Sequence, residues 1–221
     1  MSIRFDITDL EQRAEGLAKA KRALGRKQVV VIPTDTGYAL AANAFSPAGV
    51  ATLGEIKGWT TRIPPQVLIP GMPTLDALVA EISEPVRKMA EKFWPGPLTI
   101  IAPAGDSLLW DLGDDSGTVA LRLTGHEFCQ ELVSAVGPLA VSFAVKAGNE
   151  PGNIDDIVQA FEEDVDYFLV DPGMKKTAPS TIVDATAIGL PEGKIRVLRE
   201  GKVTQAQLKK VVGADLLAPA E

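Results

Sequence analysis

The chain has 221 residues, of which 46% are hydrophobic and 23% charged, and its formal net charge is −7. This length and composition suit a globular protein with a sizeable core, and the negative charge disfavours indiscriminate binding to nucleic acid or to an anionic membrane. One cysteine, Cys129, excludes a disulfide within the chain. No apolar run reaches the ~18 residues that span a bilayer, and the N-terminus does not resemble a signal peptide. We therefore expect a cytoplasmic protein.

The spacing of apolar residues predicts helices and strands that alternate along the chain. Helices are predicted where a capping residue precedes apolar positions three or four apart, at residues 8–25, 46–58, 74–82, 83–93, 128–137, 153–161 and 204–212. Strands are predicted at the short apolar or alternating runs 28–32, 67–69, 98–101, 117–123, 138–145, 167–170, 180–184 and 195–198. No repeat or change in composition divides the chain. These elements predict one α/β unit.

The stretch from residue 28 to residue 41 changes character in its middle. Residues 29–32 are four β-branched apolar residues, typical of a buried strand, and Pro33 ends their ladder of hydrogen bonds. Residues 34–38, with the sequence TDTGY, then present hydroxyls, a carboxylate and a phenol. Such a strand end suits contact with a polar ligand, but the same residue types also form turns. The segment alone leaves both interpretations open.

Two basic residues are candidates for binding an anion. Arg122 lies inside an otherwise apolar predicted strand, so its guanidinium needs an anionic partner, either a ligand carboxylate or an acidic side chain in a structural ion pair. Lys57 ends a predicted helix. A lysine there can bind a phosphate, but it also interacts favourably with the helix dipole for structural reasons alone.

Several motifs occur together in an order typical of one family. They are PTDTGY at 33–38, KG at 57–58, WPGPLT at 94–99, TVALR at 118–122, STIVD at 180–184 and LREG at 198–201. In this order and at about this spacing they resemble the YrdC/TsaC family, whose members are threonylcarbamoyl-AMP synthases. The resemblance covers residues 10–212, which we interpret as a YrdC-like domain, with residues 1–9 and 213–221 as terminal extensions.

The resemblance implies both a fold and a reaction. The fold is α/β, with a twisted, mixed open sheet, flanking helices and a positively charged concave ligand-binding face. The reaction joins ATP, L-threonine and bicarbonate into threonylcarbamoyl-adenylate and releases pyrophosphate, for synthesis of N6-threonylcarbamoyladenosine in tRNA. Mg²⁺ would bridge the nucleotide phosphates. The fold is also linked to binding of double-stranded RNA.

The same resemblance assigns two groups of site residues. Threonine would contact Thr34, Arg122 and Ser180, and the nucleotide would contact Lys57, Thr118 and Arg199. The two hydroxyl residues of the first group could equally finish turns, and Thr118 and Arg199 are of types common at exposed strand ends. We interpret His126 as a surface or capping residue and Cys129 as a core residue, so no zinc site is expected and no catalytic residue is assigned.

The sequence departs from the family pattern at the nucleotide end. Trp59 stands where the family has the arginine of a Lys-x-Arg motif, and Ile63 replaces a second basic residue. Phe143 and Val145 replace the serine and asparagine of a Ser-Ala-Asn motif. Each lost polar partner would leave a phosphate unpaired at a cost of ~1–3 kcal/mol. Two hypotheses follow: an active synthase, or a catalytically impaired homologue that binds a small ligand, a nucleotide or double-stranded RNA.

Overall fold

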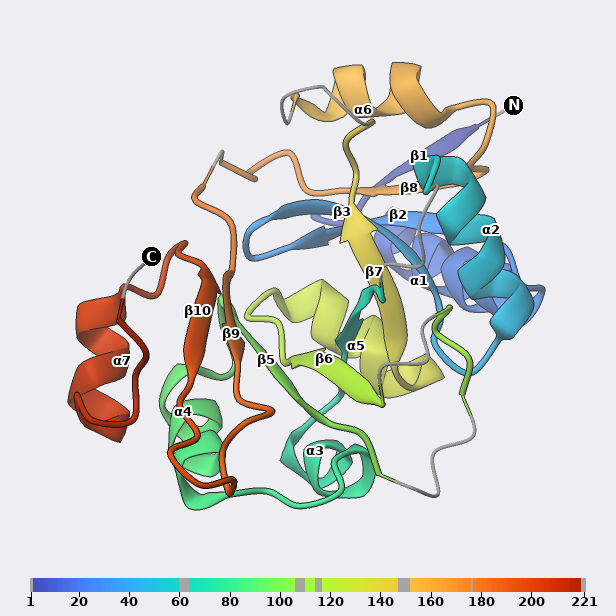
Figure 1. Ribbon diagram of the computed structural model, residues 1–221. Helices are drawn as coiled ribbons and strands as arrows, with labels where there is room; N and C mark the ends of the chain where they lie inside the picture. The colour runs from blue at the N-terminus through green and yellow to red at the C-terminus, as the bar shows by residue number, and fades with distance from the viewer. Residues whose placement is uncertain are drawn as a thin grey trace.

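The computed structural model describes residues 2–59, 64–105, 110–113, 117–146, 152–175 and 177–219. Within these ranges the chain forms a ten-stranded sheet with helices packed against it (Figure 1). The strands lie in the order β1-β8-β2-β3-β7-β4-β6-β5-β9-β10. No described helix combines the length and the apolarity needed to cross a membrane.

The predicted helices and strands are present, but β2 continues through Pro33, which was expected to end it, and pairs there with Tyr38 of β3. The helices are α1 Leu10–Gly25, α2 Pro47–Lys57, α3 Met72–Leu78, α4 Glu84–Phe93, α5 Glu127–Val136, α6 Ile154–Phe161 and α7 Gln205–Val212. The strands are β1 Ile3–Asp6, β2 Val30–Thr34, β3 Gly37–Asn43, β4 Gln66–Leu68, β5 Leu98–Pro103, β6 Thr118–Arg122, β7 Leu139–Phe143, β8 Tyr167–Val170, β9 Thr181–Asp184 and β10 Arg196–Arg199.

Parallel and antiparallel pairs mix within the sheet. The pairs β1–β8, β2–β8, β4–β6 and β5–β9 are parallel. The pairs β2–β3, β3–β7, β4–β7, β5–β6 and β9–β10 are antiparallel. The expected α/β fold with a mixed sheet and flanking helices is therefore confirmed.

Helices cover both faces of the sheet, and this explains the continuous apolar run in β2. Val30 and Ile32 face one core, which includes α1 and α5, whereas Val31 faces a second core that includes α2, α4 and α6. All three side chains are fully buried. A strand buried on both faces has no solvent side, so its sequence does not alternate between apolar and polar residues.

Two strands lie where the sequence predicts none. The sheet edge strand β1 falls within residues 1–9, the segment interpreted as a terminal extension, and it pairs in parallel with β8. Near the C-terminus of the chain, within the second segment interpreted as a terminal extension, Leu217 is buried and forms an isolated β-bridge with Ile195. The strand β3 is rich in alanine and glycine, which are weak strand formers, and its pairing with β2 and β7 overrides that preference.

The position of Phe168 yields a prediction about stability. Its side chain is fully buried in β8, which pairs with β1 and β2 at this residue. Because Phe168→Ala removes an aromatic ring from a filled core, we expect the free energy of unfolding to fall by ~3–5 kcal/mol in equilibrium urea denaturation. Leu190, which is 64% exposed, provides the control. Leu190→Ala should change stability by less than ~0.5 kcal/mol, and equal effects of the two changes would contradict the core assignment.

Candidate functional site

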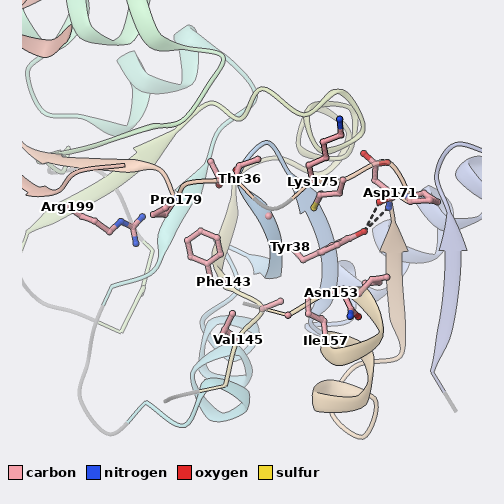
Figure 2. A pocket seen from close by; sticks show the side chains of 17 residues that line it. Thr36, Tyr38, Phe143, Val145, Asn153, Ile157, Asp171, Lys175, Pro179 and Arg199 are labelled. Atoms are coloured by element: carbon pink, nitrogen blue, oxygen red, sulfur yellow. Dashed lines mark hydrogen bonds between the residues drawn. The ribbon is translucent and has the colours of Figure 1, made fainter. Parts of the chain in front are cut away.

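A cavity of about 660 Å³ opens beside the hairpin of β2 and β3 (Figure 2). Its walls also come from the end of β7, the start of α6, the segment after β8 and the end of β10. This volume suits a small molecule. The lining residues are Thr36, Gly37, Tyr38, Phe143, Ala144, Val145, Gly152, Asn153, Ile154, Ile157, Asp171, Pro172, Met174, Lys175, Thr177, Pro179 and Arg199.

The wall of the cavity is largely apolar, with a few charged groups. Ile154 and Ile157 of α6 face it together with the side chains of Phe143 and Val145. The charged residues among the described lining are Asp171, Lys175 and Arg199. Such a pocket can enclose an apolar ligand group while a few charges fix its orientation.

Arg199, predicted to contact the nucleotide, lines the cavity. Its Nε donates to the carbonyl oxygen of Ser180 at 3.0 Å, and its Nη2 donates to the Ser180 hydroxyl at 2.9 Å. Its Cζ atom also lies 5.8 Å from the centre of the Phe143 ring, a cation–π contact. Burial lowers the pKa of Arg199. Ser180, predicted to contact threonine, is fully buried and serves here as a hydrogen-bond partner of this arginine.

Arg122 is buried in an internal ion pair and is not among the residues that line the cavity. Its Nη2 donates to Asp35 at 2.6 Å, its Nη1 to the Thr36 hydroxyl at 3.0 Å and its Nε to the Gly96 carbonyl at 3.0 Å. Burial lowers the pKa of Arg122, and the charge of Asp35 opposes that shift. The structural ion pair that the sequence left open is thus formed, and it fixes the loop between β2 and β3.

Lys57 has a structural role in this conformation. It is the last residue of α2, and its ammonium donates to the carbonyl oxygens of Phe143 and Val145. Desolvation lowers its pKa. The lysine therefore anchors the end of β7 and holds the backbone behind two of the cavity residues.

The other predicted contacts lie outside the lining. Thr34 is buried and donates to the Gly37 carbonyl at 2.7 Å, which is the turn role that the sequence left open. Thr118 begins β6 opposite Pro103. Trp59 packs against Gly54 of α2, and Ile63 lies outside the described residues.

Residues that the sequence did not single out make up much of the wall. Asp171, Ile154 and Ile157 were missed, although Asp171 directly follows the predicted strand 167–170 in the way that residues 34–38 follow the predicted strand 28–32. A polar residue after a strand was therefore the available signal. Phe143 and Val145, the positions where the sequence analysis finds departures from the family pattern, line this cavity. No cluster of three or more potential metal ligands occurs among the described residues.

The buried ion pair yields a prediction. Asp35→Asn leaves the Arg122 guanidinium, whose side chain is 3% exposed, without its anionic partner. We expect the free energy of unfolding to fall by ~3–5 kcal/mol in urea denaturation, because breaking a buried pair leaves an uncompensated charge. Asp76 pairs with Arg87 at the same distance of 2.6 Å, but both side chains are more than 40% exposed. Asp76→Asn should therefore cost less than ~1 kcal/mol, and a small effect of Asp35→Asn would refute the structural role.

Comparisons with known proteins identify relatives of this chain. The family model Sua5/YciO/YrdC, described as telomere recombination, matches residues 22–201. A Mycobacterium tuberculosis protein with the provisional name threonylcarbamoyl-AMP synthase is 39% identical over 218 residues, 97% of each chain. The Bacillus subtilis threonylcarbamoyl-AMP synthase is 30% identical over 213 residues, which are 94% of this chain and 60% of that protein.

Solved structures share the fold. Pyrococcus abyssi Sua5 complexed with L-threonine aligns with a TM-score of 0.83 and 26% identity, over all of this chain and 62% of its own. This chain thus spans less than two thirds of the archaeal protein. Escherichia coli YciO aligns with a TM-score of 0.76 and 22% identity, over 91% of this chain and 97% of its own. The resemblance that the motifs carry is confirmed, and this chain belongs to the Sua5/YciO/YrdC family.

Proposed function

We propose that the protein is a threonylcarbamoyl-AMP synthase acting in tRNA N6-threonylcarbamoyladenosine synthesis. The observation that carries the proposal is that family motifs far apart in the sequence meet at one cavity of small-molecule size. Residues 36–38 of the PTDTGY motif and Arg199 of the LREG motif line it together. The relatives named threonylcarbamoyl-AMP synthase and the archaeal structure with L-threonine support the same activity.

The proposed reaction has two steps. The amine of L-threonine adds to bicarbonate to give a carbamate with loss of water, and a carbamate oxygen then attacks the α-phosphorus of ATP. The bond to the β-phosphate oxygen breaks, and pyrophosphate leaves. Arg199 is the described lining residue that best suits a phosphate, because a guanidinium offers several N–H donors and stays charged. Arg122 contributes by holding the loop that carries Thr36.

The described residues do not fit a dedicated magnesium site. Asp171 is the one carboxylate among the described lining residues, and a single carboxylate does not form a dedicated magnesium site. Mg²⁺ often reaches such sites bound mainly to nucleotide phosphates. We therefore assign no step of the reaction to a protein-bound metal.

A second candidate function is favoured by the side chains at the end of β7. Phe143 and Val145 present apolar groups to the cavity, while the ammonium of Lys57 is directed to their carbonyl oxygens. Phosphates placed against apolar side chains lose hydrogen bonds to water without replacing them. This arrangement favours a homologue that binds a small ligand without adenylating it. RNA binding is the less favoured form of this candidate, because the net charge is −7.

Removal of the cavity arginine tests the synthase proposal. The unmodified protein should release pyrophosphate from ATP only when both L-threonine and bicarbonate are present. We expect Arg199→Met to lower kcat/KM by about 10- to 100-fold in a coupled pyrophosphate assay, since a hydrogen bond to a charged group contributes ~1.5–3 kcal/mol. The matched control is Arg87→Met, which removes a positive charge that is not among the cavity lining and should leave the rate unchanged.

Restoring the family residues separates the two candidates. The change Trp59→Arg, Phe143→Ser and Val145→Asn should raise pyrophosphate release modestly if the unmodified chain is already a synthase. A silent unmodified chain that gains threonine-dependent release through these changes would contradict the synthase proposal and support the second candidate. Calorimetric titration with ATP and with L-threonine separately would then show which ligand the unmodified cavity retains.

A further inference from the structure

The described wall of the cavity carries two positively charged side chains and one negatively charged side chain. Lys175 and Arg199 supply positive charge, whereas Asp171 supplies the one carboxylate among the described lining residues. A free amino acid carries an ammonium group as well as a carboxylate, so a pocket that recognises the whole zwitterion needs an anionic acceptor as well as a cation. Within the described wall, Asp171 is the side chain with the charge for that acceptor role.

The backbone of Asp171 is fixed by the cavity residue Tyr38. The Tyr38 hydroxyl donates to the Asp171 carbonyl and accepts from the Asp171 amide, both at 3.0 Å, as Figure 2 shows. Burial raises the pKa of Tyr38 to about 12, so the phenol stays protonated at neutral pH and keeps donating. Tyr38 of β3 therefore fixes the position of the Asp171 backbone, from which the carboxylate side chain extends.

Two N–H groups orient the carboxylate itself. Oδ1 accepts from the Gly173 amide at 2.8 Å, and Oδ2 lies 3.2 Å from Nε2 of His126. A carboxylate has about four acceptor positions, so these two contacts leave others for a ligand. The Asp171 side chain is 25% exposed, which agrees with its place in the cavity wall.

The ring of His126 is arranged to donate to this carboxylate. The residue is the N-cap of α5, but its side chain makes no capping hydrogen bond. Its Nδ1 is buried and has no hydrogen-bond partner within the described part of the chain. Nε2 is therefore the ring nitrogen that contacts the Asp171 carboxylate, and His126 orients that carboxylate from the start of α5.

We propose that Asp171 receives the α-ammonium group of the amino-acid substrate and that His126 is the positioning residue that holds its carboxylate in place. The identity of that substrate as L-threonine rests on the proposed function. Asp171 thereby makes the pocket selective for an amino acid over a hydroxy acid, because its charge-assisted bond is available only to a ligand with an amine.

The test compares L-threonine with its des-amino analogue, 3-hydroxybutyrate, by calorimetric titration. We expect the unmodified protein to bind L-threonine at least tenfold more tightly. Asp171→Asn keeps an oxygen that can accept from the Gly173 amide but loses the charge, so it should weaken threonine binding about 10- to 100-fold and leave the analogue unchanged. Glu163→Gln is the matched control, since it removes an exposed carboxylate outside the lining and should alter neither affinity.

Two changes at His126 distinguish positioning from a general role in folding. His126→Gln retains an N–H that can reach Asp171 and should keep most of the preference for threonine. His126→Ala removes the donor and should reduce that preference about 3- to 10-fold at an unchanged affinity for 3-hydroxybutyrate. A loss of affinity for both ligands in parallel would show a structural role only and would overturn the positioning assignment.

Other outcomes separate this inference from the synthase proposal. Equal binding of the two ligands, or no binding of threonine, by the unmodified protein would overturn the inference. So would an Asp171→Asn variant that keeps its preference for threonine. An unmodified protein that prefers threonine through Asp171 but releases no pyrophosphate would support the inference and contradict the synthase proposal. If Asp171→Asn instead releases pyrophosphate with the same KM for threonine as the unmodified protein, that result would support the synthase proposal and contradict the inference.

Discussion

The buried ion pair between Arg122 and Asp35 is the interaction on which the cavity wall depends. It joins the end of β6 to the loop between β2 and β3, and further bonds from the same arginine reach Thr36 and the Gly96 carbonyl. A buried guanidinium is costly unless it is paired, so this arrangement tolerates little displacement of the loop. Thr36 is itself a lining residue, and Tyr38 follows two positions later. Through Tyr38 the same constraint extends to Asp171 on the far side of the hairpin.

The end of β7 brings apolar side chains and two cations together at the cavity wall. Phe143 places an aromatic ring beneath Arg199, and the ammonium of Lys57 is directed to backbone carbonyls behind the wall. Both cations thus interact with residues of the protein that are aromatic or neutral. A ligand that binds at the end of β7 must either break these contacts or bind while they remain. The apolar wall there favours a ligand group with little charge. The active-synthase and ligand-binding hypotheses differ in whether ATP phosphates overcome this arrangement.

Much of the fold could be predicted from local sequence. The helix beginning after Ser46 was predicted from serine followed by proline, and its end from Lys57 and Gly58, which indeed adopts the left-handed conformation of a helix C-cap. The strand β3 could not be predicted in this way, since its alanines and glycine prefer other conformations and only pairing with β2 and β7 extends them. Among the six residues assigned to the site, Arg199 lines this cavity, and the ligand contacts of all six stay predictions.

The sequence by itself determined the helices, most of the strands and membership of the family, because periodicity, capping residues and motif order can be recognised without knowing which segments meet in space. Only the tertiary structure decided which side chains face the cavity. Arg122 is paired with Asp35, Ser180 with Arg199, and Asp171 with His126. Each of these pairs joins segments that lie between 19 and 87 positions apart in the sequence. A buried charged or polar side chain forms hydrogen bonds with a partner that lies close to it in the folded protein. No local sequence pattern identifies that partner.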